Sequence, residues 1–317
     1  MIAAATHLPV MSSTVLGCLA PALGQSDAVL LDCTLGLGGH AAACLERFPE
    51  LRLIGIDRDG RSLALASQRL AADADRVTTF HGRYDQLDEA LALGGVTSVS
   101  ACLFDLGLSS PQIDDPTRGF AYASDAPLDM RMDADAPGLT AADIVNTYSA
   151  ADLARIFRVY GDEPASRRVA DAIVRARQAV PFSSSARLVE VIREAKPAGT
   201  ASGGHPAKRV FQALRMEVNA ERESLAAALP AALRALRLGG RLAVLSYHSG
   251  EDRLVKRQFA SVAADQVPAG LPIVPPSRAA RFRLVTRGAE RPSVEETMTN
   301  PRSASARLRV VERIKED

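Results

Sequence analysis

The sequence has few cysteines, and none of them form a paired motif. Its four cysteines include no C-x-x-C pair, so we expect neither a disulfide framework nor a structural zinc site. The five histidines show no metal-ligand spacing, and no bound metal is expected. Cys33 and Cys102 lie inside apolar runs, where we expect them to pack as small core side chains.

Long apolar runs and repeats are also missing. No stretch of about 18 uncharged apolar residues occurs, so no helix is expected to cross a membrane. The first nine residues contain no basic segment followed by an apolar one, so we expect no secretory signal and a cytoplasmic location. The 22 glycines and 18 prolines follow no fixed period, which excludes collagen-like and coiled-coil chains.

The composition is that of a globular protein. Hydrophobic residues make up 47% and charged residues 24% of the 317 residues, which excludes a disordered chain and fits about two domains. The net charge is +1, and only four of the 38 basic residues are lysine. Arginine suits phosphates and base edges. Because the arginine excess runs along the whole chain, a coding bias is the preferred explanation.

Short apolar runs alternate with helical segments in the first third of the chain. Strands are expected at 29–33, 51–57, 77–81 and 99–105, with helices between them at 41–48, 62–70 and 87–93. A fifth strand is expected at 241–246, and a last antiparallel pair at 281–286 and 306–311. This order predicts an α/β fold with a Rossmann-like, doubly wound sheet.

The alternation stops between the fourth and fifth strands. The aperiodic segment 109–137 predicts a loop, Thr140 and Ser149 predict helix N-caps, and 167–178 and 186–195 predict amphipathic helices. A long helical tract is expected at 210–238, bent or broken near Pro230. We therefore predict a core at 1–113 and 205–317 with a helical insertion domain at 114–204.

Acidic residues and glycines gather where the predicted strands end. Asp32, Asp57 and Asp105 end the first, second and fourth strands, and Gly36 and Gly38 follow the first. Ligands of open parallel sheets bind at this edge. A pyrophosphate favours bare amides without neighbouring acids. The acids instead suit S-adenosyl-L-methionine, which carries a cationic amine and a cationic sulfonium, and Asp57 is expected to accept its ribose hydroxyls.

A proline-containing loop from Leu106 to Gln112 follows Asp105. Enzymes that methylate exocyclic amines carry an acid or amide and then such a loop at this place. The lone pair of such an amine is delocalised into its ring, so the nitrogen is a poor nucleophile. A carboxylate that accepts its N–H bonds holds it in line with the methyl donor. The loop therefore favours amine methylation.

Seven short motifs follow one another along nearly the whole chain. They are DCTLGLGGH at 32–40, DLGLSSPQ at 105–112, RGF at 118–120, PLDMRMD at 127–133, HPAKR at 205–209, SYHSGEDR at 246–253 and NPRS at 300–303. Together they resemble the bacterial small-subunit (16S) ribosomal RNA cytosine-N(4)-methyltransferases. The resemblance implies a class I methyltransferase fold with a helical insertion, S-adenosyl-L-methionine as cofactor, and methylation of one cytosine near the decoding centre.

The resemblance also assigns site residues by position. The expected cofactor contacts are Gly38, Gly39, His40, Asp57, Tyr84, Asp105 and Gln112, to which the strand-end pattern adds Asp32 and Gly36. The expected catalytic residues are Asp105, Ser246 and His248. The implied partner is 16S ribosomal RNA in the small ribosomal subunit, recognised by the insertion, with the oligomeric state left open. Segment 278–309, with eight arginines against three acids, is expected to face RNA.

Three other functions remain open at this point. A DNA amine methyltransferase shares the chemistry of the site, and substrate preference separates it from an RNA enzyme. An NAD-dependent dehydrogenase shares the glycine pattern, and thermal shift with nucleotides separates it. A non-catalytic assembly factor would bind the cofactor and RNA without methylating, and mass spectrometry of ribosomal RNA from a deletion strain separates it.

Overall fold

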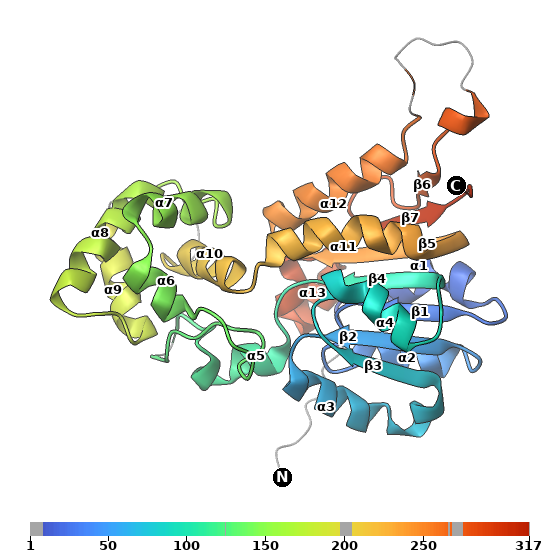
Figure 1. Cartoon of the computed structure of the whole chain (residues 1–317), viewed down its shortest axis with the longest axis horizontal. Coiled ribbons are helices and arrows are strands. Elements are labelled where there is room, and N and C mark those ends of the chain that lie inside the picture. The colour runs from blue at the N-terminus through green and yellow to red at the C-terminus, as the bar shows by residue number, and fades with distance from the viewer. Residues whose placement is uncertain (1–8, 124, 197–204, 266, 268–274, 317) are drawn as a thin grey trace. The chain divides into compact units, whose positions relative to one another are not determined.

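The computed structural model describes residues 9–123, 125–196, 205–265, 267 and 275–316. The chain forms two compact units, which we call the sheet unit (Met1–Gly107 and Ser224–Asp317) and the helical unit (Leu108–Glu223). Figure 1 shows both units, coloured from blue at the N-terminus to red at the C-terminus. The predicted insertion, 114–204, falls within the helical unit, although its predicted end at residue 204 lies outside the described residues.

The helical unit extends past the predicted insertion at its C-terminal side. Helix α10 (Lys208–Val218) buries Val210, Phe211 and Leu214 among the apolar side chains of this unit. The helix therefore belongs to the core of the helical unit, whereas the sequence prediction placed it in the sheet core.

The sheet unit is built on seven strands in the order β3-β2-β1-β4-β5-β7-β6. Strands β1 to β5 are parallel, and β7 runs antiparallel between β5 and β6. The predicted parallel sheet with a last antiparallel pair is thus confirmed. The strands are β1 (Val29–Asp32), β2 (Arg52–Asp57), β3 (Val77–His81), β4 (Val99–Asp105), β5 (Leu236–Ser246), β6 (Phe282–Leu284) and β7 (Arg307–Arg313).

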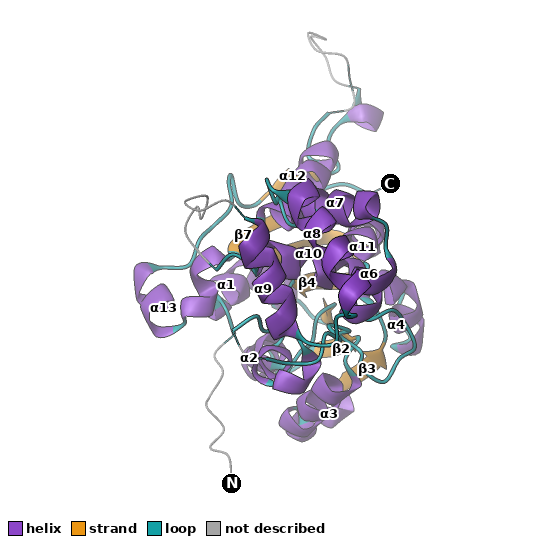
Figure 2. Ribbon diagram, turned by 90° about the vertical axis from the view of Figure 1, so that its left-hand side faces the viewer, coloured by secondary structure: helices purple, strands orange, loops and turns teal. Residues whose placement is uncertain are grey.

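Helices cover both faces of this sheet (Figure 2). Successive side chains of a strand point to opposite faces, so Leu30 packs with one helical layer and Leu31 with the other. The first layer comprises α1 (Ser12–Leu23), α2 (Gly39–Arg47) and α3 (Gly60–Arg69), and the second comprises α4 (Leu87–Leu93), α11 (Glu221–Ala235) and α12 (Ser249–Val262). Shorter elements are η1 (Ala71–Arg76), η2 (Tyr84–Gln86), η4 (Pro276–Arg278), α13 (Val294–Thr299) and η5 (Pro301–Ser305).

The long helical tract expected at 210–238 is interrupted at a different place from the one predicted. Pro230 lies inside α11, and the break falls at Asn219 and Ala220, where Ala220 has a positive φ of 47°. The Asn219 amide donates to the carbonyls of Met130 and Arg215, at 2.7 and 2.8 Å. The predicted break near Pro230 was therefore wrong. The Asn219 side chain and the turn at Ala220 end α10, and α11 then continues through Pro230.

The helical unit confirms the amphipathic helices expected there. Its elements are α5 (Ser110–Asp114), η3 (Pro116–Arg118), α6 (Ala141–Thr147), α7 (Ala150–Val159), α8 (Ser166–Ala179), α9 (Ser185–Ala195) and α10. The predicted caps are also confirmed, since Thr140 and Ser149 accept backbone N–H bonds at the starts of α6 and α7, each at 3.1 Å. Across the described ranges, no helix is long and apolar enough to cross a membrane.

Candidate active site

Three carboxylates end three neighbouring parallel strands. Asp32, Asp57 and Asp105 are the last residues of β1, β2 and β4, and β1 lies between the other two. Because parallel strands point the same way, these carboxyl groups share one edge of the sheet, as the sequence predicted. This edge is where ligands of open α/β sheets bind.

The turn after β1 is fixed to the end of β2. The Gly36 N–H donates to Asp57 Oδ2 at 2.7 Å, and the Asp59 N–H donates to Asp57 Oδ1 at 2.9 Å. Gly36 and Gly38 have positive φ angles of 54° and 72°, a conformation that glycine adopts without strain. A carboxylate has about four acceptor positions, so Asp57 shapes the turn and keeps positions for a ligand.

Asp105 is held by a hydrogen bond from one side chain and lies beside a second. Its Oδ1 accepts a 2.6 Å hydrogen bond from the Tyr247 hydroxyl, and its Oδ2 lies 3.5 Å from His40 Nε2. Its backbone N–H donates to Thr34 Oγ1 at 2.6 Å. The Asp105 side chain is 25% exposed. The carboxylate is therefore fixed in orientation while part of it stays open to a ligand.

Burial changes the pKa values of the acidic side chains at this edge of the sheet. It raises the pKa of Asp32 to about 7, against the opposing effect of nearby His40, and it raises the pKa of Asp57 to about 6. Burial and the neighbouring Asp105 carboxylate hold the pKa of Tyr247 well above its usual value. Tyr247 thus keeps its proton and remains a hydrogen-bond donor to Asp105 at every physiological pH.

His40, Gly39 and Tyr84 line the same edge. His40 is 7% exposed near the start of α2, and its Nε2 lies 3.5 Å from Asp105 Oδ2 but makes no hydrogen bond in the part of the chain that the structure describes. A Cβ atom at Gly39 would lie 3.0 Å from Pro9 Cγ, so the backbone there packs closely. Tyr84 follows β3 and meets Phe104 edge to face, with ring centroids 5.7 Å apart. An orphaned buried nitrogen and a partly buried ring are features that a bound cofactor would satisfy.

Ser246 and His248, the other predicted catalytic residues, make their side-chain contacts away from Asp105. Ser246 is 1% exposed, and its hydroxyl donates to the Arg307 carbonyl of β7 at 3.4 Å. His248 begins α12, where its Nδ1 accepts from the Glu251 N–H at 3.4 Å and its Nε2 lies 3.1 Å from Glu251 Oε1. Their catalytic role stays a prediction, and these contacts favour a supporting one.

Gln112 belongs to the helical unit. Its Oε1 accepts from the Ser109 N–H at 3.0 Å, which caps α5, and its Nε2 lies 3.5 Å from the Met132 carbonyl. The guanidinium of Arg118 donates to the same carbonyl at 2.6 Å. Two of the sequence motifs, around Gln112 and around Met132, are thereby joined within the helical unit. A cofactor contact by Gln112 stays a prediction.

Sequence reasoning missed two contacts that hold Asp105, those of Tyr247 and Thr34. Tyr247 lies between the two residues chosen as catalytic and was considered only as a reserve candidate for holding the base, and Thr34 lies in the glycine motif and was not selected. The signal was present in the alternation of side chains at a strand end. Residue 247 must point to the opposite side from residues 246 and 248. If Tyr247 faces Asp105, its two neighbours therefore face away from it.

Arginines of the C-terminal segment are used in ion pairs. Arg307 and Arg309 both contact the Asp252 carboxylate of α12, at 3.1 and 2.8 Å, and Arg283 contacts Glu312 at 2.8 Å. These pairs bind β6 and β7 to each other and to α12. An RNA-facing role for segment 278–309 stays a prediction, with fewer unpaired charges than the sequence suggested.

The strand order and the strand-end carboxylates together define a class I methyltransferase, the fold that the sequence motifs implied. The chain belongs to the MraW methylase family, whose model matches residues 4–314. Among the described residues, no group of three or more histidine, cysteine or acidic side chains is placed to hold a metal ion.

Curated relatives cover nearly the whole chain. Ribosomal RNA small subunit methyltransferase H of Streptomyces avermitilis is 55% identical over 312 residues, which are 98% of this chain and 98% of the relative. The protein of the same name from Saccharopolyspora erythraea is 56% identical over 311 residues, 98% of this chain and 94% of the relative. Among solved structures, an rRNA methylase from Streptococcus thermophilus is 13% identical, with a TM-score of 0.43 and 95% of each chain covered.

Proposed function

We propose that this methyltransferase uses S-adenosyl-L-methionine to methylate the exocyclic N4 amine of one cytosine in 16S ribosomal RNA, near the decoding centre of the small ribosomal subunit. The names of relatives about 55% identical over nearly their full lengths support a small-subunit RNA substrate. The sequence motifs support the cytosine amine. The proposed substrate requires that the enzyme work in the cytoplasm.

The residues at the sheet edge fit the proposed cofactor. Asp57 has acceptor positions left for ribose hydroxyls, and the turn at Gly36 and Gly38 lets a ligand approach the backbone. Tyr84 offers a ring for adenine. Asp32 and Asp105 supply negative charge where a cationic amine and sulfonium would bind. The cofactor supplies an electrophilic methyl group, and the protein residues bind, orient and polarise.

Asp105 carries the proposed chemistry. Its carboxylate, fixed by Tyr247 and still 25% exposed, is proposed to accept an N–H bond from the cytosine amine. An amine that is held by one of its hydrogens is oriented toward the methyl donor without a bimolecular search. As the methyl group transfers, the amine gains positive charge, and the nearby carboxylate stabilises that charge until the nitrogen gives up one of its two protons. The Asp105–Tyr247 pair is the observation that carries this proposal.

The helical unit is proposed to bind the RNA. Every proposed cofactor residue except Gln112 lies in the sheet unit. The helical unit therefore has most of its surface available for a macromolecular substrate.

One experiment tests the function. The purified chain is incubated with isotopically methyl-labelled S-adenosyl-L-methionine and small ribosomal subunits from a strain that lacks its own copy of the gene. Nucleoside mass spectrometry is expected to find label on one cytosine N4 of 16S RNA. Duplex DNA serves as the control substrate. Label on DNA alone, on carbon 5, or nowhere would contradict the proposal.

Cofactor affinity is expected to fall as the pH is lowered from about 7.5 to 5.5. The raised pKa values of Asp32 and Asp57, about 7 and about 6, mean that both carboxyls gain protons over this range in the free protein. A cationic ligand binds the ionised forms better, so those protons must be released on binding, and affinity drops by about a hundredfold. Isothermal titration calorimetry across the range measures this.

The Asp32→Asn variant is the control for that profile. Asparagine cannot ionise, so the part of the change centred near pH 7 should disappear while the part near pH 6 remains. An affinity that is constant over the range in the wild-type protein would show that neither carboxyl faces the cationic ligand.

A further inference from the structure

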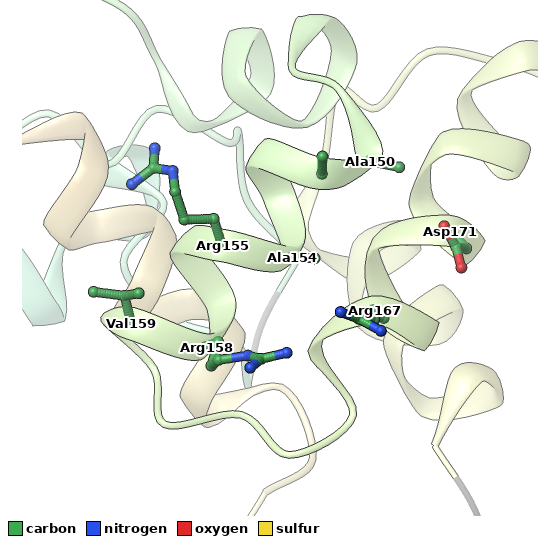
Figure 3. Close-up of a pocket in the computed structure, with 8 residues that line it drawn as sticks. Ala150, Ala154, Arg155, Arg158, Val159, Arg167 and Asp171 are labelled. Atoms are coloured by element: carbon green, nitrogen blue, oxygen red, sulfur yellow. The ribbon is translucent and has the colours of Figure 1, made fainter.

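A groove of about 500 Å³ lies on the helical unit, between α7 and the start of α8. Its α7 side is formed by Ala150, Ala151 and Ala154, whose small side chains leave room above the helix. Val159, at the end of α7, is 41% exposed at its edge. Figure 3 shows the groove with these residues as sticks. The room and the apolar lining suit a flat ring or a sugar.

Three arginines surround this apolar lining. Arg155 and Arg158 extend from α7 and Arg167 from the first turn of α8, against one acid, Asp171. Arg155 already has an acidic partner, since its guanidinium lies 3.7 Å from Glu217 Oε1. Within the described ranges, no ion pair or hydrogen bond joins the side chain of Arg158 or Arg167 to another residue. Their charges are therefore free for a ligand.

Figure 3 shows Arg158 and Arg167 extending from opposite walls toward the space between the two helices. Two guanidinium groups at such a place repel each other, and an anion between them removes the repulsion. The N-terminus of the 14-residue α8, which has no side-chain cap, adds positive partial charge on the same side. The groove thus combines an apolar lining with anion-binding groups on its rim.

We infer that this groove binds one nucleotide step of the substrate strand, with the phosphate held by Arg158 and Arg167 and the sugar or base lying on the alanines. Planar guanidinium forks match phosphate oxygens in pairs. Single-stranded nucleic acids bind through cationic grooves with room for bases. The inference rests on the proposed function, because it names the part of the helical unit that engages the proposed RNA.

The double variant Arg158→Ala/Arg167→Ala tests the groove. Both side chains are exposed, so the fold should be unaffected. The KM for unmethylated small subunits is expected to rise at least about fivefold, with kcat unchanged, because charge-assisted contacts to phosphate are lost. The dependence of log affinity on log salt should become shallower by about 1.4, or about 0.7 for each of two lost phosphate contacts on a single strand.

Arg175→Ala is the matched control, since Arg175 is an exposed arginine of α8 that does not line the groove. It should leave KM and the salt slope within about twofold of wild type. Equal changes in Arg175→Ala and in the double variant would overturn the inference in favour of general charge. A wild-type KM in the double variant would overturn it outright.

A second comparison separates RNA from an acidic protein of the subunit. The double variant should also bind a naked 16S transcript more weakly, and normal binding to the transcript with weak binding to the particle would overturn the inference in favour of a protein contact. Cofactor affinity, measured by calorimetry, should not change. If the wild-type chain methylates no ribosomal RNA at all, the proposed function fails, whereas failure of the groove alone leaves that activity intact.

Discussion

Replacing Asp105 by asparagine is expected to slow single-turnover methylation at least about tenfold, equivalent to about 1.4 kcal/mol of activation free energy. The amide keeps the size of the side chain and loses its charge. Since the amine gains positive charge during transfer, the lost stabilisation is larger in the transition state than in the bound ground state. The rate is measured with saturating cofactor and saturating small subunits, so that weaker binding does not contribute.

Tyr247→Phe is the companion variant for that measurement. It removes the 2.6 Å hydrogen bond to Asp105 and leaves the carboxylate charged. The expected loss is smaller, about two- to tenfold, which corresponds to one hydrogen bond of about 0.5–1.5 kcal/mol. A wild-type rate in Asp105→Asn would remove Asp105 from the chemistry and leave it a binding residue, and Tyr247→Phe would then be silent as well.

Replacing Asp57 by alanine is expected to weaken S-adenosyl-L-methionine binding by about 1.5–3 kcal/mol, or about ten- to a hundredfold. Alanine removes the acceptor for the ribose hydroxyls. It also removes the acceptor of the Gly36 N–H bond, at 2.7 Å, which fixes the glycine turn to β2. The two losses act on the same ligand, one directly and one through the turn.

Calorimetry on the folded variant measures this affinity, and thermal unfolding confirms the fold. Asp57→Asn is the matched control, because its carbonyl oxygen can still accept one of the two backbone N–H bonds. Its affinity should fall between those of the wild type and the alanine variant. Unchanged affinity in a folded Asp57→Ala protein would contradict the assignment of the ribose contact.

The strands of the sheet unit and their acidic ends were predictable because their signals are local. A short apolar run followed by an acid or a glycine turn predicts both the strand and the residue at which it ends, as at Asp32 and Asp57. The parallel order of β1 to β4 follows from the intervening helices. The residues that end these strands could therefore be placed at one edge without knowledge of any distance.

The start of β5 was not predictable in the same way. Gly239 and Gly240 indicated the end of a helix, whereas they lie inside the strand, which begins at Leu236. A Cβ at Gly240 would lie 3.1 Å from the carbonyl oxygen of Ser100 in β4, and the register between the two strands shifts beside it. Gly240 is needed at a register shift between two strands that lie more than a hundred residues apart in the sequence. A local sequence pattern cannot predict such a shift.

Tyr247 illustrates the same limit for the site. Its partner Asp105 is 142 residues away, and only the pairing of β4 with β5 brings the two together. The family motifs marked both segments as important. Which of three consecutive side chains turns toward Asp105 depends on the register of that pairing, because a shift by one residue would exchange their faces.

The interruption of the sheet unit by the helical unit affects how the protein is made. Strand β4 ends at Asp105, and its neighbour β5 starts at Leu236, so the ribosome synthesises the whole helical unit in between. During that time the β5 side of β4 is an unpaired edge, the kind of surface on which chains aggregate. Strand β7, which separates β5 from β6, is completed only at Arg313. The helical unit is one continuous segment and can fold early, whereas the methyl-transfer site also needs Tyr247, which the ribosome adds only after the whole helical unit.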